Sequence, residues 1–536
     1  KRPDRRGAMH LSKHDLFQMN DEWLKKLPAE LLLEVSKRLL HDVKELQDRL
    51  NQNPDNSSRP PTSQAPWAKT GDSEEQRGAA DESDTADAAA ERATGSATEE
   101  TEQASPVDGQ RSSTKKGSGR RPGKQPGSPG HGRSQKLAIT ARCEHRPEFC
   151  AACAAALSTD AASQAYTAWD EVDIAPQVEG LIGLTFRVTR HTLREVSCSC
   201  GHVSRAQPWR APADGQWEKV ELGEWRLVGP RLAGVIVLLA LRMRLSRASI
   251  RELLMEMFEL TLSTGVIDET IREAGRASLP LEDALVADIV QAAQLHVDET
   301  SWPESGVLLW LWALVTTHTT LFLIGPRSRE MLENALQDGF PGMLISDGYG
   351  VYRAWENRLR CWPHLMRKLR GLAESSDARV SGVGQEMEGI MKTLMAAIYA
   401  ARIDPPPEGL PARYAKAIER LRHLCEAHRR DDHSVLRSVV REFLYDWNVI
   451  LRPVAEPHLP LSNNAAEQAL RHWVISRYIS HGTRSEEGSR AFAFLASLIE
   501  TCRRRGASAW QYLGTVIAAA RKGLQLPTIP AIPATV

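Results

Sequence analysis

The sequence predicts a multidomain α/β protein built around a mixed β-sheet with flanking helices and an all-helical insertion. Two patterns lead to this fold class. From residue 294 the expected elements follow the order β-β-β-α-β-α-β, a hairpin meander followed by alternating units, which makes a mixed sheet. Residues 367–455 then have helical periodicity, apart from a break at Pro405–Pro407. At about 100–200 residues per domain, 536 residues indicate three to five domains.

The core elements are read from short apolar runs bounded by turn residues. QLHVDETSW is a strand that ends in acids, and VLLWLWALVTT and TTLFLIG form a hairpin with its turn near His318. RSREMLENALQ is a helix, GMLISDGYG a buried strand that runs into a turn, and RLRCWPHL a further short strand. A helix from about Ser462 closes the domain.

The segments before this core differ sharply in composition. Residues 20–52 predict one helix whose leucines recur at spacings of three and four, either a coiled coil that can self-associate or an amphipathic helix packed on its own domain. SRASIRELLMEMFELTLSTGVIDETIREA predicts a helix, a Gly-containing turn and a second helix, which is either a DNA-binding helix-turn-helix or an ordinary αα-hairpin. The predicted domains are residues 1–55 (helical or coiled coil), 56–136 (disordered acidic then basic linker), 137–225 (zinc-binding module), 226–293 (helical, helix-turn-helix-like), 294–371 (core, first part), 372–458 (helical insertion), 459–522 (C-terminal helices of the core) and 523–536 (tail).

The composition is that of an ordinary soluble protein, with 42% hydrophobic and 25% charged residues. The apolar run Leu232–Leu241 is about half the length of a membrane-spanning helix, and the N-terminus has no secretory pattern, so a cytoplasmic protein is expected. The balance of 68 basic and 68 acidic residues hides unlike parts. Residues 71–110 hold twelve acids and two bases, whereas residues 111–136 hold eight bases and no acid, and residues 468–522 hold nine bases and three acids. The basic half of the linker suits phosphate contacts or is a plain solvated tether, and zero net charge does not exclude DNA binding.

Five of the eight cysteines lie between Cys143 and Cys200, beside strand-like pieces at Leu181–Thr189 and Glu195–Ser199. In a cytosolic chain this clustering favours metal ligation over disulfides. Cys150, Cys153, Cys198 and Cys200 are the predicted ligands of a structural Zn²⁺. Because Cys198-x-Cys200 is tighter than the usual spacing, His202 and Cys143 are alternative ligands.

Three acids predict a second metal site, and we refer to Asp298, Asp347 and Glu467 as the carboxylate triad. Asp298 and Asp347 each follow an apolar strand directly, and Glu467 lies on the helix after the insertion, where Ser462 or Asn463 can cap the first turn. Carboxylate oxygens are the ligands that Mg²⁺ prefers. Two such ions about 3.5–4 Å apart can support in-line phosphoryl displacement.

VDETSW, SDGYGVY, RCWPHLMRKL and NNAAEQALR, in this order, resemble the core motifs of insertion sequence 66 transposases, which belong to the DDE group with an RNase H-like fold. NSSRPPTSQAPW and RRPGKQPGSPGHGR resemble the linker of that family, the cysteines its zinc module, and GTRSEEGSRAFAFLASLIETCRRRG with AWQYL its C-terminal segment. The resemblance covers most of residues 50–515. It implies that the carboxylate triad, with separations of 49 and 120 residues, is the catalytic set.

The same motifs supply residues that can support the reaction or contact DNA. His364 can orient water or contact DNA, or it is a satisfied histidine at a strand end. Arg471 lies four residues after Glu467 on the same helical face, near the expected phosphate or in an ion pair with the acid. The remaining supporting or DNA-binding candidates are Trp362, Arg367, Lys368, Arg370, Arg477 and Asn464.

The resemblance implies a DNA transposase that hydrolyses phosphodiesters at transposon ends and then joins the 3′-hydroxyl to target DNA with two Mg²⁺ (or Mn²⁺) ions and a structural Zn²⁺. Its expected partners are transposon-end and target DNA, a second copy of the chain and accessory proteins of the same element, and its expected location is the bacterial nucleoid. A catalytically silent DNA-binding derivative and a structure-specific nuclease on the same fold are the alternatives.

Overall fold

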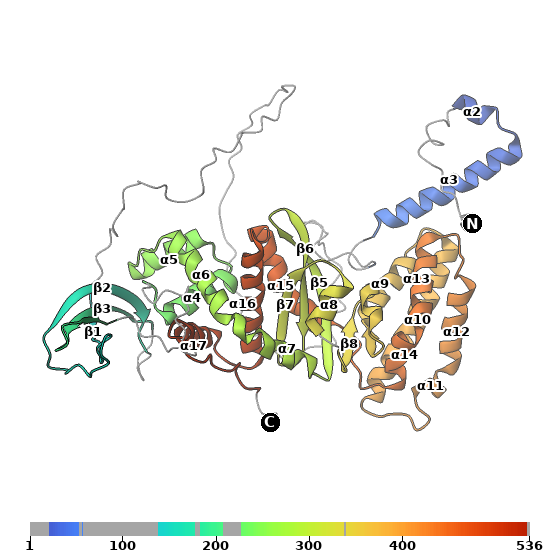
Figure 1. The fold of residues 1–536 in the computed structure, drawn as a ribbon. Coiled ribbons are helices and arrows are strands. Elements are labelled where there is room, and N and C mark those ends of the chain that lie inside the picture. The colour runs from blue at the N-terminus through green and yellow to red at the C-terminus, as the bar shows by residue number, and fades with distance from the viewer. Residues whose placement is uncertain are drawn as a thin grey trace, which may run out of the picture. The chain divides into compact units, whose positions relative to one another are not determined.

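The computed structural model describes residues 21–52, 56, 138–176, 183–206, 227–336 and 339–532 (Figure 1). The predicted linker after Asn56, the basic arm at Arg120–Arg133 and the end of the predicted tail lie outside these residues. Two separate β-sheets and a large set of helices make up the described part, so the predicted mixed α/β class is confirmed. Within the described ranges, none of the helices combines the length and apolar character needed to cross a lipid bilayer.

The N-terminal helix is broken in two, and the prediction of one helix over 20–52 was wrong. Helix α2 covers Asp21–Lys25 and α3 covers Ala29–Leu50, with Pro28 at the N-cap of α3. Proline has no N–H to donate, so a helix begins after it more readily than it runs through it.

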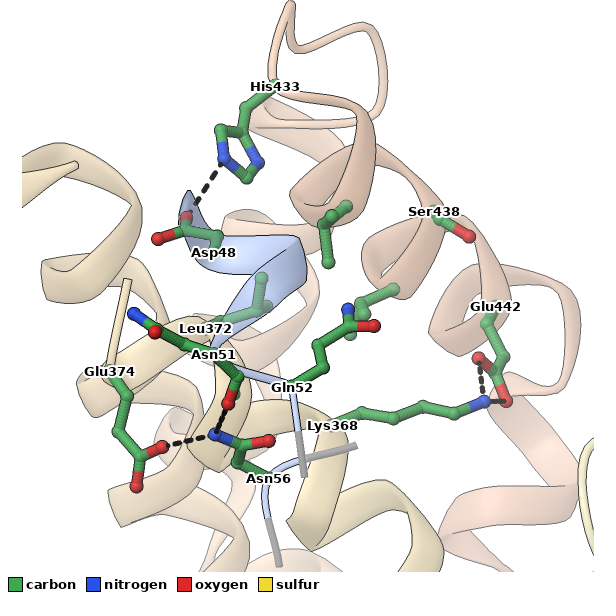
Figure 2. A pocket seen from close by; sticks show the side chains of 13 residues that line it. Asp48, Asn51, Gln52, Asn56, Lys368, Leu372, Glu374, His433, Ser438 and Glu442 are labelled. Atoms are coloured by element: carbon green, nitrogen blue, oxygen red, sulfur yellow. Dashed lines mark hydrogen bonds and ion pairs between the residues drawn. The ribbon is translucent and has the colours of Figure 1, made fainter. Parts of the chain in front are cut away.

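Helix α3 contacts its own chain through polar side chains. Glu45 is buried and accepts a hydrogen bond from Ser434 Oγ (2.5 Å), and Asp48 accepts one from the Ser376 N–H (2.8 Å). Figure 2 shows the cavity of about 460 Å³ beside this contact, lined in part by Asp48, Asn51, Asn56, Lys368, Glu374 and His433. Most apolar residues of the helix are exposed, namely Leu31, Leu32, Leu33, Leu40, Val43, Leu46 and Leu50, whereas Val35 and Leu39 are half-buried.

The first sheet has the order β1-β3-β2, with β4 paired to β3. Its strands are β1 (Ala141–His145), β2 (Ser163–Ile174), β3 (Phe186–Ser197) and β4 (Val203–Arg205). The prediction of two separate pieces at Leu181–Thr189 and Glu195–Ser199 was wrong, because β3 is one continuous strand. Its polar middle is held by pairing on both sides, with β1 in parallel and β2 in antiparallel register.

Helices follow from residue 230, including the predicted helix–turn–helix. They are α4 (Pro230–Leu241), α5 (Arg247–Phe258), α6 (Thr264–Ser278), the 3₁₀ turn η3 (Leu279–Leu281) and α7 (Glu282–Val290). Ser246 and Ser263 cap α5 and α6 by accepting hydrogen bonds from N–H groups three residues on. The expected glycine turn is wrong in one respect: Gly265 lies in the first turn of α6, and the left-handed residue that ends α5 is Glu259 (φ 51°).

The second sheet is mixed and has the order β7-β6-β5-β8-β9. Its elements are β5 (Gln294–Glu304), β6 (Val307–Val315), β7 (Thr320–Gly325), α8 (Arg329–Leu336), β8 (Met343–Ser346), η4 (Gly350–Ala354) and β9 (Arg358–Arg360). Strands β5, β6 and β7 are antiparallel, whereas β8 and β9 continue the sheet in parallel. The expected helix between the last two strands is only the short 3₁₀ turn η4.

The predicted strand RLRCWPHL was wrong beyond Arg360. Helix α9 (Trp362–Ala373) begins there with Pro363 in its first turn, where proline fits because no N–H partner is needed. The insertion continues as α10 (Ala378–Ala401), α11 (Leu410–Arg413), α12 (Ala415–Ala427), α13 (Ser434–Tyr445) and α14 (Trp447–Ala455). Besides the expected break at Pro405–Pro407, the helices are interrupted at 374–377 and 428–433, where Asp377 and His433 cap the next helix.

Three C-terminal helices return to the second sheet, namely α15 (Asn464–Ser480), α16 (Glu486–Arg504) and α17 (Ala509–Arg521). Helix α16 covers the edge strand β7, whose backbone N–H groups at Thr320 and Phe322 donate to Thr501 Oγ1 (3.1 Å) and Ser497 Oγ (2.8 Å). Side chains thereby pair a strand edge that would otherwise be open. One apolar core joins this sheet to α4–α7 and α15–α17, and a separate core lies inside the insertion.

Candidate active site

Strands β5 and β8 bring Asp298 and Asp347 to the same level of the second sheet. The strands are parallel, and their last residue pair is His296 with Ile345. Two residues further on, Asp298 continues β5 and Asp347 directly follows β8. Neighbouring parallel strands rise together at about 3.3 Å per residue. The two acids therefore lie side by side, just beyond the last paired residues of β5 and β8.

Asn463 attaches the helix of Glu467 to the strand of Asp298. It is fully buried (0% exposed), and its Nδ2 donates to the carbonyl oxygen of Val297 (2.8 Å), the residue before Asp298. Its Oδ1 accepts from His296 Nδ1 (3.1 Å). The expected capping role was wrong, because the Asn463 side chain makes no cap hydrogen bond with α15 and is used for the sheet instead.

Cys361 completes the connection to Asp347. Its Sγ accepts from the backbone N–H of Asn463 (3.3 Å), and its own N–H donates to the carbonyl oxygen of Ser346 (2.9 Å), the residue before Asp347. Asn463 and Cys361 thus form one buried junction that holds all three acids in place. Each aspartate is the next residue after a backbone carbonyl bonded to this junction, and Glu467 lies one helical turn after Asn463.

The carboxylate triad interacts electrostatically. Burial raises the pKa of Asp298 well above its ordinary value, and the charges of Asp347 and Glu467 raise it further. Burial also raises the pKa of Glu467, although the charges of Arg367 and Arg471 oppose this. A cation is stabilising where neighbouring negative charges raise the pKa of a buried carboxyl, as they do for Asp298.

His364 stands beside Glu467, with Nδ1 at 3.6 Å from its Oε1. Neither atom makes a hydrogen bond to another described residue, and both are buried. Burial, together with the charge of Arg367, lowers the pKa of His364 to about 4, so the imidazole is neutral near pH 7. His364 lies in the first turn of α9 and not at a strand end.

The donor set fits divalent cations that prefer oxygen ligands. The three side chains come from different elements, and burial disfavours the charged form of Asp298 and of Glu467. Glu467 Oε1 makes no hydrogen bond to another described residue, so it can bind a cation. Cys361, His364 and Glu467 form one group of described residues whose possible ligand atoms all lie within 4.8 Å of one another. The three acids of the triad do not together form such a group among the described residues.

Glu299 and its partners were missed from the sequence, although VDETSW and SDGYGVY contain two of them. Glu299 accepts hydrogen bonds from Arg327 Nη2 (2.6 Å) and from the Tyr352 hydroxyl. The Arg327 guanidinium also lies over the rings of Trp310 (4.2 Å) and Tyr349 (3.9 Å). Burial raises the pKa of Glu299, and the charge of Asp347 adds to the shift, so this cluster directly adjoins the triad.

Comparison with known families identifies this part of the chain. Residues 227–491 match the sequence model of the family described as "Transposase IS66 family". The chain carries an IS66 family transposase domain. The match includes α4–α7, the second sheet, the insertion and α15, so the whole triad lies inside the IS66 domain.

Two curated relatives, both from Sinorhizobium fredii (strain NBRC 101917 / NGR234), are similar to the chain. Uncharacterized protein y4jO is 30% identical over 172 residues, which are 32% of this chain and 51% of the relative. Uncharacterized protein y4qI is 24% identical over 293 residues, which are 47% of this chain and 52% of the relative. The chain thus spans about half the length of the curated relatives it matches.

Several candidate DNA-contacting residues of the IS66 domain are engaged inside it. Trp362 is fully buried, and its Nε1 donates to the carbonyl oxygen of Ile450 (3.0 Å). Lys368 Nζ pairs with both Glu442 oxygens (2.8 and 2.7 Å), and Arg477 Nη1 donates to Thr300 Oγ1 (2.9 Å) on β5.

The other candidates are less enclosed. Arg370 lies 3.7 Å from Glu388, and Asn464 is exposed at the start of α15. Arg367 and Arg471 lie close enough to Glu467 for their charges to lower the pKa of its carboxyl, against the effect of burial.

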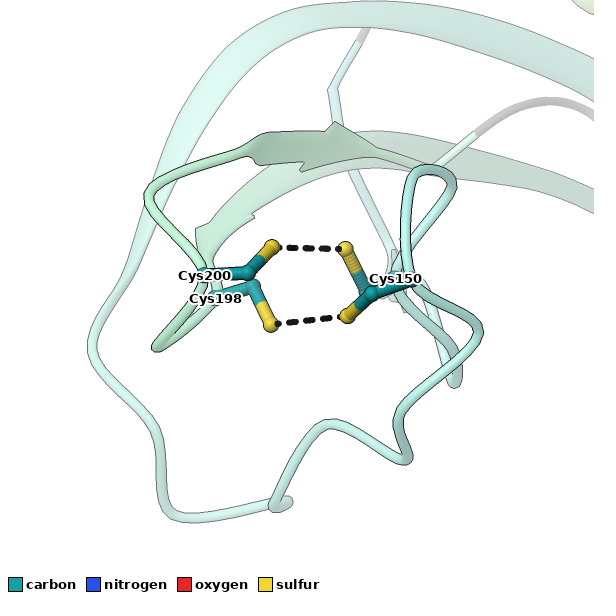
Figure 3. A group of neighbouring side chains, drawn as sticks. Cys150, Cys198 and Cys200 are labelled. Carbon is teal, nitrogen blue, oxygen red and sulfur yellow. Dashed lines mark hydrogen bonds between the residues drawn. The ribbon is translucent and has the colours of Figure 1, made fainter.

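Outside the IS66 domain, four cysteines form a compact cluster beside the first sheet (Figure 3). Cys150 Sγ lies 3.6 Å from Cys200 Sγ, and Cys153 Sγ lies 3.7 Å from Cys198 Sγ. Sulfurs bound tetrahedrally at about 2.3 Å from one Zn²⁺ would lie about 3.8 Å apart. The cluster therefore has the dimensions of a closed tetrathiolate site.

The tight Cys198-x-Cys200 spacing is accommodated by a turn between β3 and β4. The Cys198 N–H donates to the His202 carbonyl oxygen (2.9 Å), and Gly201 has φ +86°. Backbone N–H groups of Cys153 and Ala152 lower the pKa of Cys150 to about 5, which favours its thiolate. The two alternative ligands do not join the four thiols. Among the described residues, His202 belongs to no group of side chains close enough to share a metal ion, and Cys143 belongs to a different group.

Proposed function

We propose that the protein is a DDE transposase with an RNase H-like core, which cleaves DNA phosphodiesters at transposon ends and joins the 3′-hydroxyl to target DNA. The observation that carries this proposal is the convergence of Asp298, Asp347 and Glu467 at one edge of the second sheet, inside the IS66 domain. The mixed sheet, with antiparallel β5–β7 and parallel β8–β9, supports the fold assignment.

The chemistry requires that the carboxylate triad binds two divalent ions. When bound, Mg²⁺ supplies Lewis-acid activation of the attacking oxygen and stabilises the leaving oxygen. The residues of the chain have separate tasks. The triad holds the cations, neutral His364 can accept a hydrogen bond from a water molecule or a DNA hydroxyl, and Arg367 and Arg471 offer charge to the scissile phosphate.

DNA is the proposed partner of three further parts. The capped pair α5–α6 serves as the helix-turn-helix, the four-cysteine cluster holds a structural Zn²⁺ that fixes the turn between β3 and β4, and the basic arm contacts phosphate. The protein would act on DNA in the bacterial cytoplasm, together with accessory proteins of the same element.

A homo-oligomer is proposed through α3. The polar side of this helix contacts the insertion, while Leu46 and Leu50 remain 56% and 82% exposed. Half-buried Leu39 and exposed Val43, Leu46 and Leu50 follow one another at spacings of four, three and four, which is the spacing of a coiled-coil seam. Leu46→Asp should convert an oligomer into a monomer in analytical ultracentrifugation, and an unchanged mass would exclude this interface.

The proposed reaction is tested with DNA that bears the ends of the element. Asp298→Asn, Asp347→Asn and Glu467→Gln should each abolish Mg²⁺-dependent cleavage, whereas Glu486→Gln, which changes an exposed acid in the first turn of α16, should not. Cleavage retained by all three triad variants would overturn the proposal. DNA binding without nicking by the wild type would favour a silent DNA-binding protein, and cleavage without joining would favour a structure-specific nuclease.

A further inference from the structure

A second group of metal-ligating side chains lies on the first sheet, apart from the four-cysteine cluster. Cys143, His145 and His191 each offer a ligand atom, and these atoms all lie within 4.8 Å of one another. Strand pairing brings them together: Cys143 is the register partner of His191 in the parallel β1–β3 pair, and His145 is two residues further along β1 on the same face. The function proposed above makes no use of these residues.

The two imidazoles are held in a fixed arrangement. His145 Nε2 lies 3.0 Å from His191 Nδ1, and the ring of Trp169 on β2 stacks on both. The Trp169 ring centre is 4.5 Å from that of His191, with an interplanar angle of 11°. Nitrogen ligands at about 2.0–2.1 Å from one tetrahedral ion would be about 3.4 Å apart, so a small rotation of the rings would seat a cation.

The contact between the two rings uses only one of the two nitrogens of His191. His191 Nε2 is buried and has no hydrogen-bond partner among the described residues. Burial lowers the pKa of both imidazoles.

The donor types select the class of ion. One thiolate and two imidazoles suit Zn²⁺ and related transition metals, and they do not suit Mg²⁺, which prefers oxygen. We propose that Cys143, His145 and His191 bind one transition-metal cation of the zinc class, separate from any ion of the four-cysteine cluster. Three protein ligands leave the fourth position of a tetrahedral ion for water or another small ligand. The ion would also join β1 to β3, whose pairing covers only five residues.

The proposal is tested by counting metal in the full-length chain. Protein freed of metal with a chelator and kept reduced is reloaded with Zn²⁺ under excess Mg²⁺, and tightly bound zinc per chain is measured after gel filtration. Cys143→Ser and His191→Gln should each bind one equivalent less than the wild type. His202→Gln, which removes an exposed histidine outside the group, should bind as much as the wild type.

The two zinc sites are distinguished in a Cys150→Ser/Cys153→Ser background. This variant should keep one Zn²⁺, and Co²⁺ in its place should show the absorption of a site with a single thiolate, which Cys143→Ser then removes. Equal zinc in Cys143→Ser and the wild type would overturn the proposal, as would the absence of metal from the double variant while its circular dichroism stays that of the wild type. Neither readout depends on DNA cleavage.

Discussion

Asn463 and Asn464 are adjacent, yet the structure predicts opposite outcomes when each is replaced. Asn463→Ala removes the donor to the buried Val297 carbonyl and the acceptor for half-buried His296. A buried carbonyl left without a donor costs about 1–3 kcal/mol, and the second hydrogen bond contributes about 0.5–1.5 kcal/mol. The free energy of unfolding should therefore fall by about 2–4 kcal/mol. Asn464→Ala changes an exposed residue and should stay within about 0.5 kcal/mol.

Activity should fall as well, because Asn463 fixes α15 against β5 one helical turn before Glu467. A displacement of about 1 Å in a reacting group can cost about 10²-fold in rate. The effect is measured as Mg²⁺-dependent cleavage at a temperature where both variants are folded, together with hydrogen exchange of the β5 amides.

Asn463→Asp separates the donor from the shape of the side chain. It keeps an acceptor for His296 but has no N–H for Val297, so it should lose activity as Asn463→Ala does. If Asn463→Ala and Asn464→Ala had equal activity and equal exchange rates, the junction would have no role in positioning the triad, and the reasoning would be refuted.

Three further predictions concern charge, backbone and pH. Asp446→Ala should destabilise the fold by about 3–5 kcal/mol in urea denaturation, because Arg358 and Arg360 stay buried without it, whereas exposed Asp268→Ala should cost at most about 1 kcal/mol. Gly482→Ala should lower the thermal midpoint of unfolding, because φ is +83° and a Cβ would stand 1.9 Å from a backbone oxygen. Gly389→Ala, in helix α10, should raise the thermal midpoint, because the new Cβ would meet nothing within 4 Å. Burial and neighbouring negative charge raise the pKa of Asp298 and of Glu467, so both bind protons more readily as the pH falls. The half-saturating Mg²⁺ concentration should therefore rise as pH falls, by up to about tenfold per unit for each displaced proton, and a flat profile would contradict this.

Local patterns in the sequence were enough to predict most of the second sheet and to single out the triad. Asp347 directly follows the apolar strand β8, and such a strand end is visible in a short window of sequence. The prediction that Asp298 also ends a strand was wrong, because pairing with β6 continues β5 past it to Glu304. Glu467 follows a helix start signal, which is equally local.

Residues whose role depends on distant partners could not be found in this way. Asn463 bonds to Val297 across 166 positions, and the sequence signal around it suggests only a helix cap. Strand β2 was missed because its apolar residues are interrupted by charged ones, and pairing with β3 decides its structure. Cys143 was grouped with the other thiols by proximity in sequence, whereas the parallel register of β1 and β3 puts it beside His191.

The insertion separates Asp347 from Glu467 by 120 residues, yet its length has little influence on the geometry of the triad. It leaves and re-enters the core at one point, where the Trp362 N–H donates to the Leu461 carbonyl oxygen (2.8 Å) beside the contact between Cys361 and Asn463. With both ends fastened, doubling a loop costs only about 0.6 kcal/mol.

The charges at the base of the insertion impose a stricter requirement than its length. Arg358 and Arg360 on β9 are 6% and 1% exposed, and Asp446 at the start of α14 accepts hydrogen bonds from both. Burial opposes ionisation of Asp446, but its arginine partners outweigh it and lower the pKa of the carboxyl. An insertion of another length could therefore serve the same site, provided that it returned a carboxylate to β9 next to the strand that carries Asp347.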